Sequence, residues 1–468
     1  MVALALGLAA HPLVSLAQPA PAPGATSAAP AASPATPTAA APAAAPAAAP
    51  AAAAAPTAPF VQGFDKINSG DTAWMLTSTA LVLMMTIPGL GLFYAGMVRK
   101  KNILATLMQS FAITCLVTVL WWLVGYSLAF TPGSKYIGSL HWAFLNHVVY
   151  MHDAMKVSSS HLASTIPETI YVMFQATFAI ITPALICGSF AERMKFSAML
   201  WFMSAWLIVV YCPVAHWMWE STSGWFASTQ LDFAGGTVVH INAGVAGLAT
   251  ALMLGKRQGL GRESMAPYNL TLTVVGASLL WVGWFGFNAG SAVVSDGRAA
   301  MAFAVTHIAT AVAALAWMFT EWLVKGKPSV LGICSGAVAG LVAITPASGF
   351  VSPNSSVIIG IAAGVVCFFT STSLKKAVGY DDSLDAFGVH CIGGIIGALL
   401  TGALVSKEIS GATGSVLLQL RGVIATLVWS FVMSLVLLKL IDLTIGLRVS
   451  AEDEREGLDI SQHGEALG

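Results

Sequence analysis

Eleven stretches of the chain are almost entirely apolar and long enough to form helices that cross a bilayer. Hydrocarbon about 30 Å thick requires roughly 20 helical residues. The stretches lie near residues 73–97, 103–130, 169–189, 196–214, 236–254, 268–289, 299–323, 330–346, 355–373, 388–405 and 415–444. The pattern therefore predicts an all-α membrane protein with eleven transmembrane helices, of which 330–346 is the shortest.

Basic residues are distributed unevenly between the loops that join these stretches. Thirteen follow odd-numbered stretches: Arg99, Lys100, Lys101, Arg193, Lys195, Lys256, Arg257, Arg262, Lys325, Lys327, Lys375, Lys376 and Arg448. Four follow even-numbered stretches: Lys135, Lys156, Arg298 and Lys407. Because Lys and Arg accumulate on the cytoplasmic side of a membrane, we predict a multi-pass protein whose N-terminus lies outside and whose acidic C-terminal tail is cytoplasmic.

The two ends of the chain differ in composition from the apolar stretches. Residues 1–22 include a short apolar run typical of a secretory signal peptide. Residues 23–70 are rich in Ala and Pro, which predicts a flexible segment, since such a tract buries too little side-chain volume to offset its ordering entropy. A transmembrane domain at 71–446 and a cytoplasmic tail at 447–468 would follow.

Two short motifs recur at an offset of five stretches. Residues 93–96 and 287–290 both read Phe-x-Ala-Gly, while His240 and His390 each follow a valine and precede glycines at +4 and +7. Because five is odd, the second copy would be inserted upside down. The repeat thus predicts a five-plus-five inverted architecture, with a pathway at the interface of the halves. The eleventh helix has no counterpart and would brace the outside.

Composition supports lipid as the solvent of this chain. Hydrophobic residues make up 57% and charged residues 9%, whereas a soluble domain carries about 25% charge. A net charge of zero, without a Lys/Arg-rich block, argues against nucleic acid as a partner. The six cysteines lie in or beside apolar runs, so neither a disulfide scaffold nor a zinc site is expected.

His240 and His390 are polar residues inside apolar stretches, one in each half of the repeat. Two neutral imidazoles can share one hydrogen bond and still offer a donor and an acceptor to a small polar molecule. A packing role is the alternative for either residue. A metal pair is a rival use, but no Cys, Asp or Glu stands close in the sequence to complete a coordination shell.

Other polar residues stand near these two positions. Asp232 opens the stretch that carries His240, where it would cap the helix, attract a cation, or do both. Asp385 is predicted to occupy the corresponding place before His390. Phe287 and Ser291 are one helical turn apart, so a ring and a hydroxyl could present together to a small cation.

Four longer segments carry motifs that can be compared with known families. They are residues 191–197 (AERMKFS), 232–243 (DFAGGTVVHINA), 283–291 (GWFGFNAGS) and 385–390 (DAFGVH). These motifs resemble those of the bacterial ammonium transporters, the Amt branch of the Amt/Rh family, and the likeness runs from about Asp71 to His463. It implies ammonium uptake by a homotrimer in the cytoplasmic (inner) membrane, with one pore per subunit, no enzymatic activity and no cofactor.

The resemblance assigns roles to individual residues. The family's outer ammonium site has two phenylalanines, a tryptophan and a serine, which correspond here to Phe178, Trp219, Phe287 and Ser291. Phe178 and Phe287 would form a stacked gate, His240 and His390 would line the pore, and Asp232 would support the outer site. The tryptophan favours Amt over Rh. One departure is Glu220-Ser-Thr-Ser, where the family has a glycine run.

The resemblance also implies a mechanism and partners. Ammonium, or methylammonium as its analogue, would be deprotonated near the gate, and ammonia would pass along the histidines. The tail at 447–468 would pack on the cytoplasmic face and support regulation by PII signal proteins. An ammonium sensor with little flux is an alternative on the same fold. A membrane enzyme with a histidine-bound metal is a second alternative.

Overall fold

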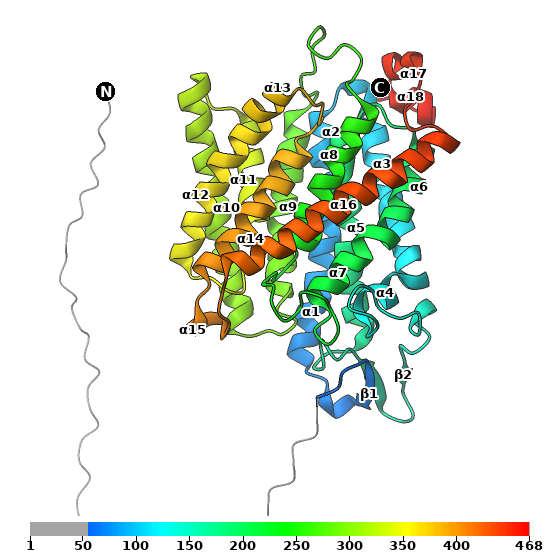
Figure 1. Ribbon diagram of the computed structural model, residues 1–468, viewed down its shortest axis with the longest axis vertical. Coiled ribbons are helices and arrows are strands. Elements are labelled where there is room, and N and C mark those ends of the chain that lie inside the picture. Colours follow the sequence, from blue (N-terminus) through cyan, green and yellow to red (C-terminus); the bar gives the residue numbers. More distant parts are fainter. Residues whose placement is uncertain (1–54, 468) are drawn as a thin grey trace, which may run out of the picture. The chain divides into compact units, whose positions relative to one another are not determined.

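The protein is a bundle of long helices that lie side by side (Figure 1). The computed structural model describes residues 55–467, so the predicted signal peptide at 1–22 and most of the Ala/Pro-rich segment lie outside the described residues. Within that range, ten helical segments have the length and composition of transmembrane spans. An eleventh, Val330–Ile344, is apolar but shorter. The eleven predicted spans and their all-α class are confirmed.

Most spans consist of consecutive helical pieces. The α-helices are α1 (Ser69–Met84), α2 (Gly91–Met97), α3 (Ile103–Leu120), α4 (Tyr126–Phe130), α5 (Glu168–Phe190), α6 (Phe196–Trp206), α7 (Cys212–Trp219), α8 (Asn242–Leu254), α9 (Leu270–Gly290), α10 (Gly297–Lys325), α11 (Val330–Ile344), α12 (Pro353–Phe369), α13 (Lys375–Val378), α14 (Ile392–Leu404), α15 (Lys407–Ser410), α16 (Val416–Thr444), α17 (Ala451–Glu456) and α18 (Leu458–His463). Wider π-helical pieces continue them at η4 (Trp121–Gly125), η6 (Leu207–Tyr211), η7 (Gly236–Ile241), η8 (Thr370–Leu374) and η9 (Phe387–Cys391). The segment η2 (Met85–Leu90) joins α1 to α2 across a kink, where Ile87 is not helical.

Polar residues placed just before apolar runs determine where many helices begin. A side-chain oxygen that accepts a backbone N–H of the first turn satisfies a donor that has no partner within the helix. The residues that do so are Asn68 for α1, Asn269 for α9, Asp296 for α10, Ser329 for α11, Ser352 for α12, Ser415 for α16 and Ser450 for α17. At each of these residues a loop therefore ends and a helix begins.

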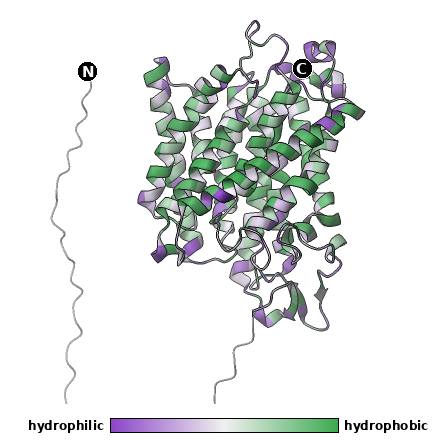
Figure 2. Cartoon of the chain, viewed as in Figure 1, coloured by the Kyte–Doolittle hydropathy of each residue, from purple (hydrophilic) through white to green (hydrophobic). Residues whose placement is uncertain are grey.

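The burial of the helices follows their place in the bundle. In the most apolar part of α5, 94% of the residues are buried, whereas in the corresponding part of α16 only 28% are buried. Figure 1 shows α16 running obliquely across the bundle, where it packs against α8, α14 and α6. Figure 2 shows apolar residues along the helices and hydrophilic residues gathered at both ends of the bundle. The predicted bracing position of the eleventh helix is confirmed.

A small antiparallel sheet lies at one end of the bundle, opposite α17 and α18 (Figure 1). Its strands are β1 (Phe60–Gly63), β2 (Tyr150–Met151) and β3 (Lys156–Ser159), in the order β1-β3-β2. Phe60 pairs with Ser159 and Gly63 with Lys156. The segment 23–70, which was predicted to be flexible, therefore contains a strand and the first residues of α1 at its C-terminal end.

Buried ion pairs join the loops at the other end. Arg257 Nη2 lies 2.9 Å from Asp381 Oδ1 and its Nη1 lies 3.4 Å from Glu192 Oε2, while Arg99 Nη2 lies 2.8 Å from the same Glu192 oxygen. Burial alone would raise the pKa of Glu192, but Arg257 and Arg99 outweigh it and hold that pKa below its ordinary value. The network therefore links the loops at 99, 192, 257 and 381.

The C-terminal tail docks on this network. The Glu454 carboxylate is 1% exposed on its side chain and lies 2.7 Å from Arg448 Nη2. It also accepts a hydrogen bond from the backbone N–H of Gln258 at 2.6 Å. On α18, Asp459 accepts the backbone N–H of Ala105 at 2.8 Å. The acidic tail is therefore an ordered, packed element at least as far as α18.

Candidate functional site

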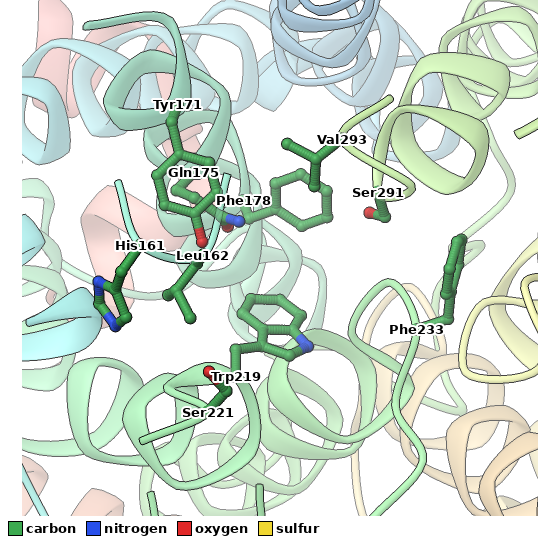
Figure 3. Close-up of a pocket in the computed structure, with 10 residues that line it drawn as sticks. All are labelled: His161, Leu162, Tyr171, Gln175, Phe178, Trp219, Ser221, Phe233, Ser291 and Val293. Atoms are coloured by element: carbon green, nitrogen blue, oxygen red, sulfur yellow. The ribbon is translucent and has the colours of Figure 1, made fainter. Parts of the chain in front are cut away.

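A cavity of about 350 Å³ opens at the end of the bundle that carries the sheet. It is lined by His161, Leu162, Tyr171, Gln175, Phe178, Trp219, Ser221, Phe233, Ser291 and Val293 (Figure 3). Three of the four residues predicted for an outer ammonium site are therefore in its wall. The fourth, Phe287, lies directly behind Phe178.

Trp219 is the last residue of α7 and is held in a fixed orientation. Its indole Nε1 donates a hydrogen bond to the backbone oxygen of Asp232 at 2.9 Å. Its ring stacks on Phe130 at 6.1 Å between centroids and meets Phe178 edge-on at 5.8 Å and 86°. An aromatic face held this way can attract a cation in the cavity through its quadrupole.

Ser291 follows α9 and places a hydroxyl on the opposite side of the cavity (Figure 3). Its Oγ donates to the backbone oxygen of Phe287 at 2.8 Å. Because the hydroxyl proton is used within the helix, the oxygen lone pairs remain to accept a hydrogen bond. This arrangement suits a ligand that only donates, as an ammonium ion does.

Two phenylalanines separate the cavity from the interior. The rings of Phe178 and Phe287 have centroids 4.2 Å apart and planes inclined at 37°. The two residues are 1% and 0% exposed. They belong to α5 and α9, and their contact leaves no open passage for a hydrated ion at this level. Passage requires that at least one ring moves.

His240 and His390 lie beyond these rings. Their centroids are 5.4 Å apart and their planes differ by 15°, and the His240 ring is 6.0 Å from that of Phe287. Both ring nitrogens of His240, and Nδ1 of His390, are without a hydrogen-bond partner among the described residues. The hydrogen bond that two imidazoles can share is not formed in this structure, because the rings face each other nearly parallel.

Glycines from the two halves explain how the histidines meet. A Cβ on Gly244 would lie 2.3 Å from the backbone nitrogen of Cys391, the residue after His390. A Cβ on Gly394 would lie 2.9 Å from the Ile241 side chain, next to His240. Each glycine stands four residues after one histidine and touches the residue that follows the other. This reciprocal contact is what an inverted repeat produces at its pseudo-two-fold axis.

Asp232 caps the helical segment that carries His240. Its two carboxylate oxygens accept the backbone N–H groups of residues 235 to 238, at distances between 2.6 and 3.1 Å. The helix begins at Gly236, and Gly235 before it has a φ of +106°, which a glycine adopts readily. The carboxylate therefore binds four backbone N–H groups as a helix cap. The main-chain oxygen of Asp232 accepts the hydrogen bond from Trp219.

The corresponding cap in the second half is Asp382 and not Asp385. Asp382 accepts the backbone N–H groups of Ala386 and Phe387 at 3.1 and 2.7 Å. Asp385 instead contacts the Lys375 ammonium and has a φ of 62°. The prediction that Asp385 corresponds to Asp232 is therefore wrong, and the corresponding residue, Asp382, stands three positions earlier. A signal was present, because Asp232 and Asp382 each stand eight residues before their histidine.

Several residues at the cavity were not predicted from the sequence. Tyr171 and Gln175 lie on the same face of α5 as Phe178, at helical spacings of seven and three residues before it, so this periodicity could have revealed them. His161 and Glu220 are 59 positions apart and meet only in the fold, at 2.8 Å. No local pattern indicates that contact.

The metal-enzyme alternative can be compared with this geometry. Across residues 55–467, no group of three or more His, Cys, Asp or Glu side chains is arranged to hold a metal ion. His240 instead lies against the rings of Trp284 and Phe287, at 5.3 and 6.0 Å between centroids. Nothing in the described part of the chain favours a metal site at the histidine pair.

The two inverted halves, with a cavity, a ring pair and two buried histidines at their interface, have the architecture of many membrane transport proteins. Residues 73–467 match the model of the Ammonium Transporter Family. The chain belongs to this family, which consists of transporters rather than enzymes.

Similar proteins agree with the assignment. An ammonium transporter of Bacillus subtilis is 47% identical over 406 residues, covering 85% of this chain and 98% of the relative. One from Aquifex aeolicus is 48% identical, covering 86% and 93%. The crystal structure of Candida albicans Mep2 superposes with a TM-score of 0.77 at 34% identity, covering 83% of this chain and 88% of that one.

Proposed function

We propose that the chain takes up ammonium across the cytoplasmic membrane by recruiting the cation at the outer cavity and conducting ammonia past the histidines. Its similarity to ammonium transporters of 42–48% identity supports this substrate. At the cavity, the Trp219 face attracts the charge and the Ser291 oxygen accepts an N–H. Phe178 and Phe287 form the floor of the site and the gate beneath it.

Deprotonation near the gate follows from the energetics of the pathway. A bare cation buried in an apolar environment carries a large desolvation cost. Cation–π contacts of about 0.5–2 kcal/mol each offset only a small part of it. They suffice at the partly wet mouth but not between the two phenylalanine rings. Neutral ammonia passes at much lower cost, and the unpartnered nitrogens of His240 and His390 can donate to it or accept from it.

One observation carries the proposal: the cavity wall, the phenylalanine pair and the histidine pair are successive neighbours in the structure. The rings of Phe178 and Phe287 are 4.2 Å apart, Phe287 and His240 are 6.0 Å apart, and His240 and His390 are 5.4 Å apart. This order of neighbours supports a pathway in which a solute from the cavity meets each group in turn. The two histidines are the last groups of this series and the ones able to exchange protons.

Flux or current in liposomes containing the purified protein tests the proposal. Ammonium and methylammonium should both produce saturable transport, while potassium at the same concentration should not. Protein-free liposomes give the background from ammonia that crosses lipid unaided. Equal transport of potassium and ammonium, or none above that background, would contradict the proposal.

We further propose a homotrimer in the inner membrane, with the N-terminus outside after removal of a signal peptide and the tail in the cytoplasm. This orientation is supported because it places thirteen of the basic residues named above on the cytoplasmic side and four on the outside. The docked tail, with Glu454 bound to the loop residue Gln258 and Asp459 bound to Ala105 in the first turn of α3, supports regulation by a PII signal protein at that face. Crosslinking and accessibility labelling of single cysteines at Lys101 and Lys135 would test assembly and orientation.

An ammonium sensor with little flux is the second candidate. A protein described as a sensor Amt protein superposes with a TM-score of 0.76 at 26% identity, covering 84% of this chain and 98% of that one. The same bundle therefore occurs in a protein named for sensing. The liposome assay separates the two, because a sensor would bind ammonium at the cavity without saturable transport.

A further inference from the structure

Gln175 places a side-chain amide in the wall of the outer cavity. It lies on α5 three residues before Phe178, so the two side chains share one face of the helix. It lines the cavity together with Trp219 and Ser291 (Figure 3). The residue is 8% exposed, so nearly all of its surface is covered by its neighbours. A neutral polar group is therefore built into the place where a cation would be recruited.

The amide oxygen of Gln175 lacks the partner that a buried acceptor normally has. Its Oε1 makes no hydrogen bond within residues 55–467. The large majority of buried polar groups in proteins are hydrogen-bonded, because an acceptor removed from water without a replacement bond destabilises the fold. The donors of Trp219 and Ser291 are both bound to backbone oxygens and cannot serve it. The Gln175 oxygen is therefore available to a ligand that donates a hydrogen bond.

The amide can present its oxygen to the cavity by turning about its last side-chain bond. This torsion has a broad preference, and a half turn exchanges the positions of the amide oxygen and nitrogen. The oxygen is covered in the structure, so such a turn would accompany the entry of a ligand. The Tyr171 hydroxyl lies close to the amide. Because a hydroxyl both donates and accepts, Tyr171 can bond either end of the amide and supports both orientations.

A small cation that carries only N–H donors fits this amide. Each bond that such an ion gives up with water on entering the cavity has to be replaced by an acceptor in the wall. The rings of Trp219 and Phe178 attract its charge through their faces but offer no oxygen lone pair. Ser291 at the end of α9 and Gln175 on α5 supply oxygens from two different helices. The amide therefore adds to the cavity a kind of contact that the rings cannot make.

We propose that Gln175 is a further binding residue for ammonium, whose amide oxygen accepts an N–H bond from the ion in the outer cavity. The inference rests on the proposed function and assigns one more contact to the same site. A hydrogen bond with a charged donor is stronger than one between neutral groups, so the ion competes well with water for this oxygen. The contact forms before the ion is deprotonated. Gln175 therefore sets how strongly ammonium is recruited and leaves the steps beyond Phe178 unchanged.

Two substitutions of similar length separate the acceptor from the shape of the side chain. Gln175→Met fills a similar volume without an oxygen, so the half-saturating ammonium concentration in liposomes should rise about three- to tenfold. Limiting transport should change less. Gln175→Glu keeps an oxygen acceptor in either protonation state of the carboxyl group, so its half-saturating concentration should stay at or below that of the wild type.

A second glutamine provides the matched control. Gln109 on α3 is 3% exposed, and its Oε1 likewise has no hydrogen-bond partner in the described part of the chain, but it does not line the cavity. Gln109→Met thus replaces a buried, unpartnered amide by the same apolar side chain. Its half-saturating concentration should match the wild type. A rise equal to that of Gln175→Met would show a general effect of the substitution and overturn the inference.

The remaining outcomes separate this inference from the proposed function. A wild-type half-saturating concentration in Gln175→Met, or an equal rise in Gln175→Met and Gln175→Glu, would overturn the inference, and saturable transport by the wild type would leave the proposed function intact. Gln175→Leu is a second apolar variant with the same expected rise, for use where the methionine variant does not fold. Absence of ammonium transport by the wild type above the protein-free background would overturn the proposed function, and this inference with it.

Discussion

Trp219 and Ser291 are the two residues that we propose hold an ammonium ion at the outer cavity, each by a different interaction. Replacing either one should raise the half-saturating ammonium concentration about three- to tenfold, since one cation–π contact or one hydrogen bond is lost. Limiting flux should change less, because both contacts act before the ion is desolvated. The concentration dependence of transport in liposomes for Trp219→Leu and Ser291→Ala measures this effect.

A second tryptophan provides the control for that experiment. Trp201 on α6 is 67% exposed on the outside of the bundle, so Trp201→Leu removes the same ring without touching the cavity. Its concentration dependence should match the wild type. If both cavity variants also matched the wild type, Trp219 and Ser291 would have no part in recruitment.

The roles of single residues were predictable where sequence neighbours share a function. Ser291 and Phe287 are four residues apart on one helix and lie together in the structure. Asp382 was missed although its spacing to His390 repeats that of Asp232 to His240. His161 and Glu220 could not be paired at all, because the contact depends on how two distant loops fold back onto the cavity.

At the scale of helices, Gly244 controls how closely the two halves approach. A Cβ there would lie 2.3 Å from the backbone of Cys391, which has no freedom to move away as a flexible side chain would. Gly244→Ala should therefore separate the segments that carry His240 and His390, lower the unfolding temperature in detergent and reduce transport. Thermal unfolding and liposome flux measure the two effects.

Gly297 provides a matched control for that substitution. It is the first residue of α10, and a Cβ added there would meet no atom within 4 Å. Gly297→Ala should leave both the unfolding temperature and transport near those of the wild type. Equal behaviour of the two alanine variants would show that close packing at Gly244 is not required.

The docked tail gives a prediction at the same scale. Deleting residues 447–468 removes Glu454 and Asp459, whose carboxylates accept the backbone N–H groups of Gln258 in a loop and of Ala105 at the start of α3. We expect an inserted protein with altered transport and no inhibition by a PII protein. Liposome flux with and without the purified PII partner measures this. Full inhibition of the truncated protein by PII would exclude the tail from regulation.

The ion pairs beneath the tail should make stability depend on acid pH. Burial would raise the pKa values of Glu192 and Asp381, but Arg257 and, for Glu192, Arg99 outweigh it and lower both. Groups with lowered pKa values stabilise the fold above their ordinary values of 4.5 and 3.8, and this contribution is lost as pH falls below them. The unfolding temperature in detergent should therefore fall below about pH 4.5.

Two substitutions determine whether these pairs cause the loss. Asp381→Asn should lower the unfolding temperature at neutral pH and flatten its fall in acid, since its carboxylate no longer needs to be protonated. Asp65→Asn is the control, because Asp65 is 71% exposed and its ion pair within residues 55–467 is with exposed Lys66. An acid profile that is identical in wild type and Asp381→Asn would assign the loss of stability to other groups.

For the whole molecule, the apolar pattern was sufficient to predict eleven spans, since each must cross hydrocarbon as a continuous helix. The inverted repeat followed from two motifs and is visible in the reciprocal contacts of Gly244 and Gly394. The small sheet was missed because its strands have two to four residues and β1 lies within the segment 23–70 that was predicted to be flexible. The stacked, unbonded arrangement of the two imidazoles was missed because it depends on helix crossing and not on local sequence.

The central claim is that ammonium passes the histidine pair as ammonia, with the imidazoles handling protons. His240→Leu or His390→Leu should leave a folded protein, since no hydrogen bond between the rings is lost, but should abolish ammonium-driven current. His240→Asp or His390→Asp would place an acidic group in the pathway and should lower the selectivity for ammonium over potassium.

Current across liposomes with ammonium and with potassium, measured for the wild type and these four variants, tests the claim most directly. The account predicts ammonium current and no potassium current for the wild type, little of either for the leucine variants, and potassium current for the aspartate variants. Wild-type ammonium current in both leucine variants would contradict it and reduce His240 and His390 to packing residues.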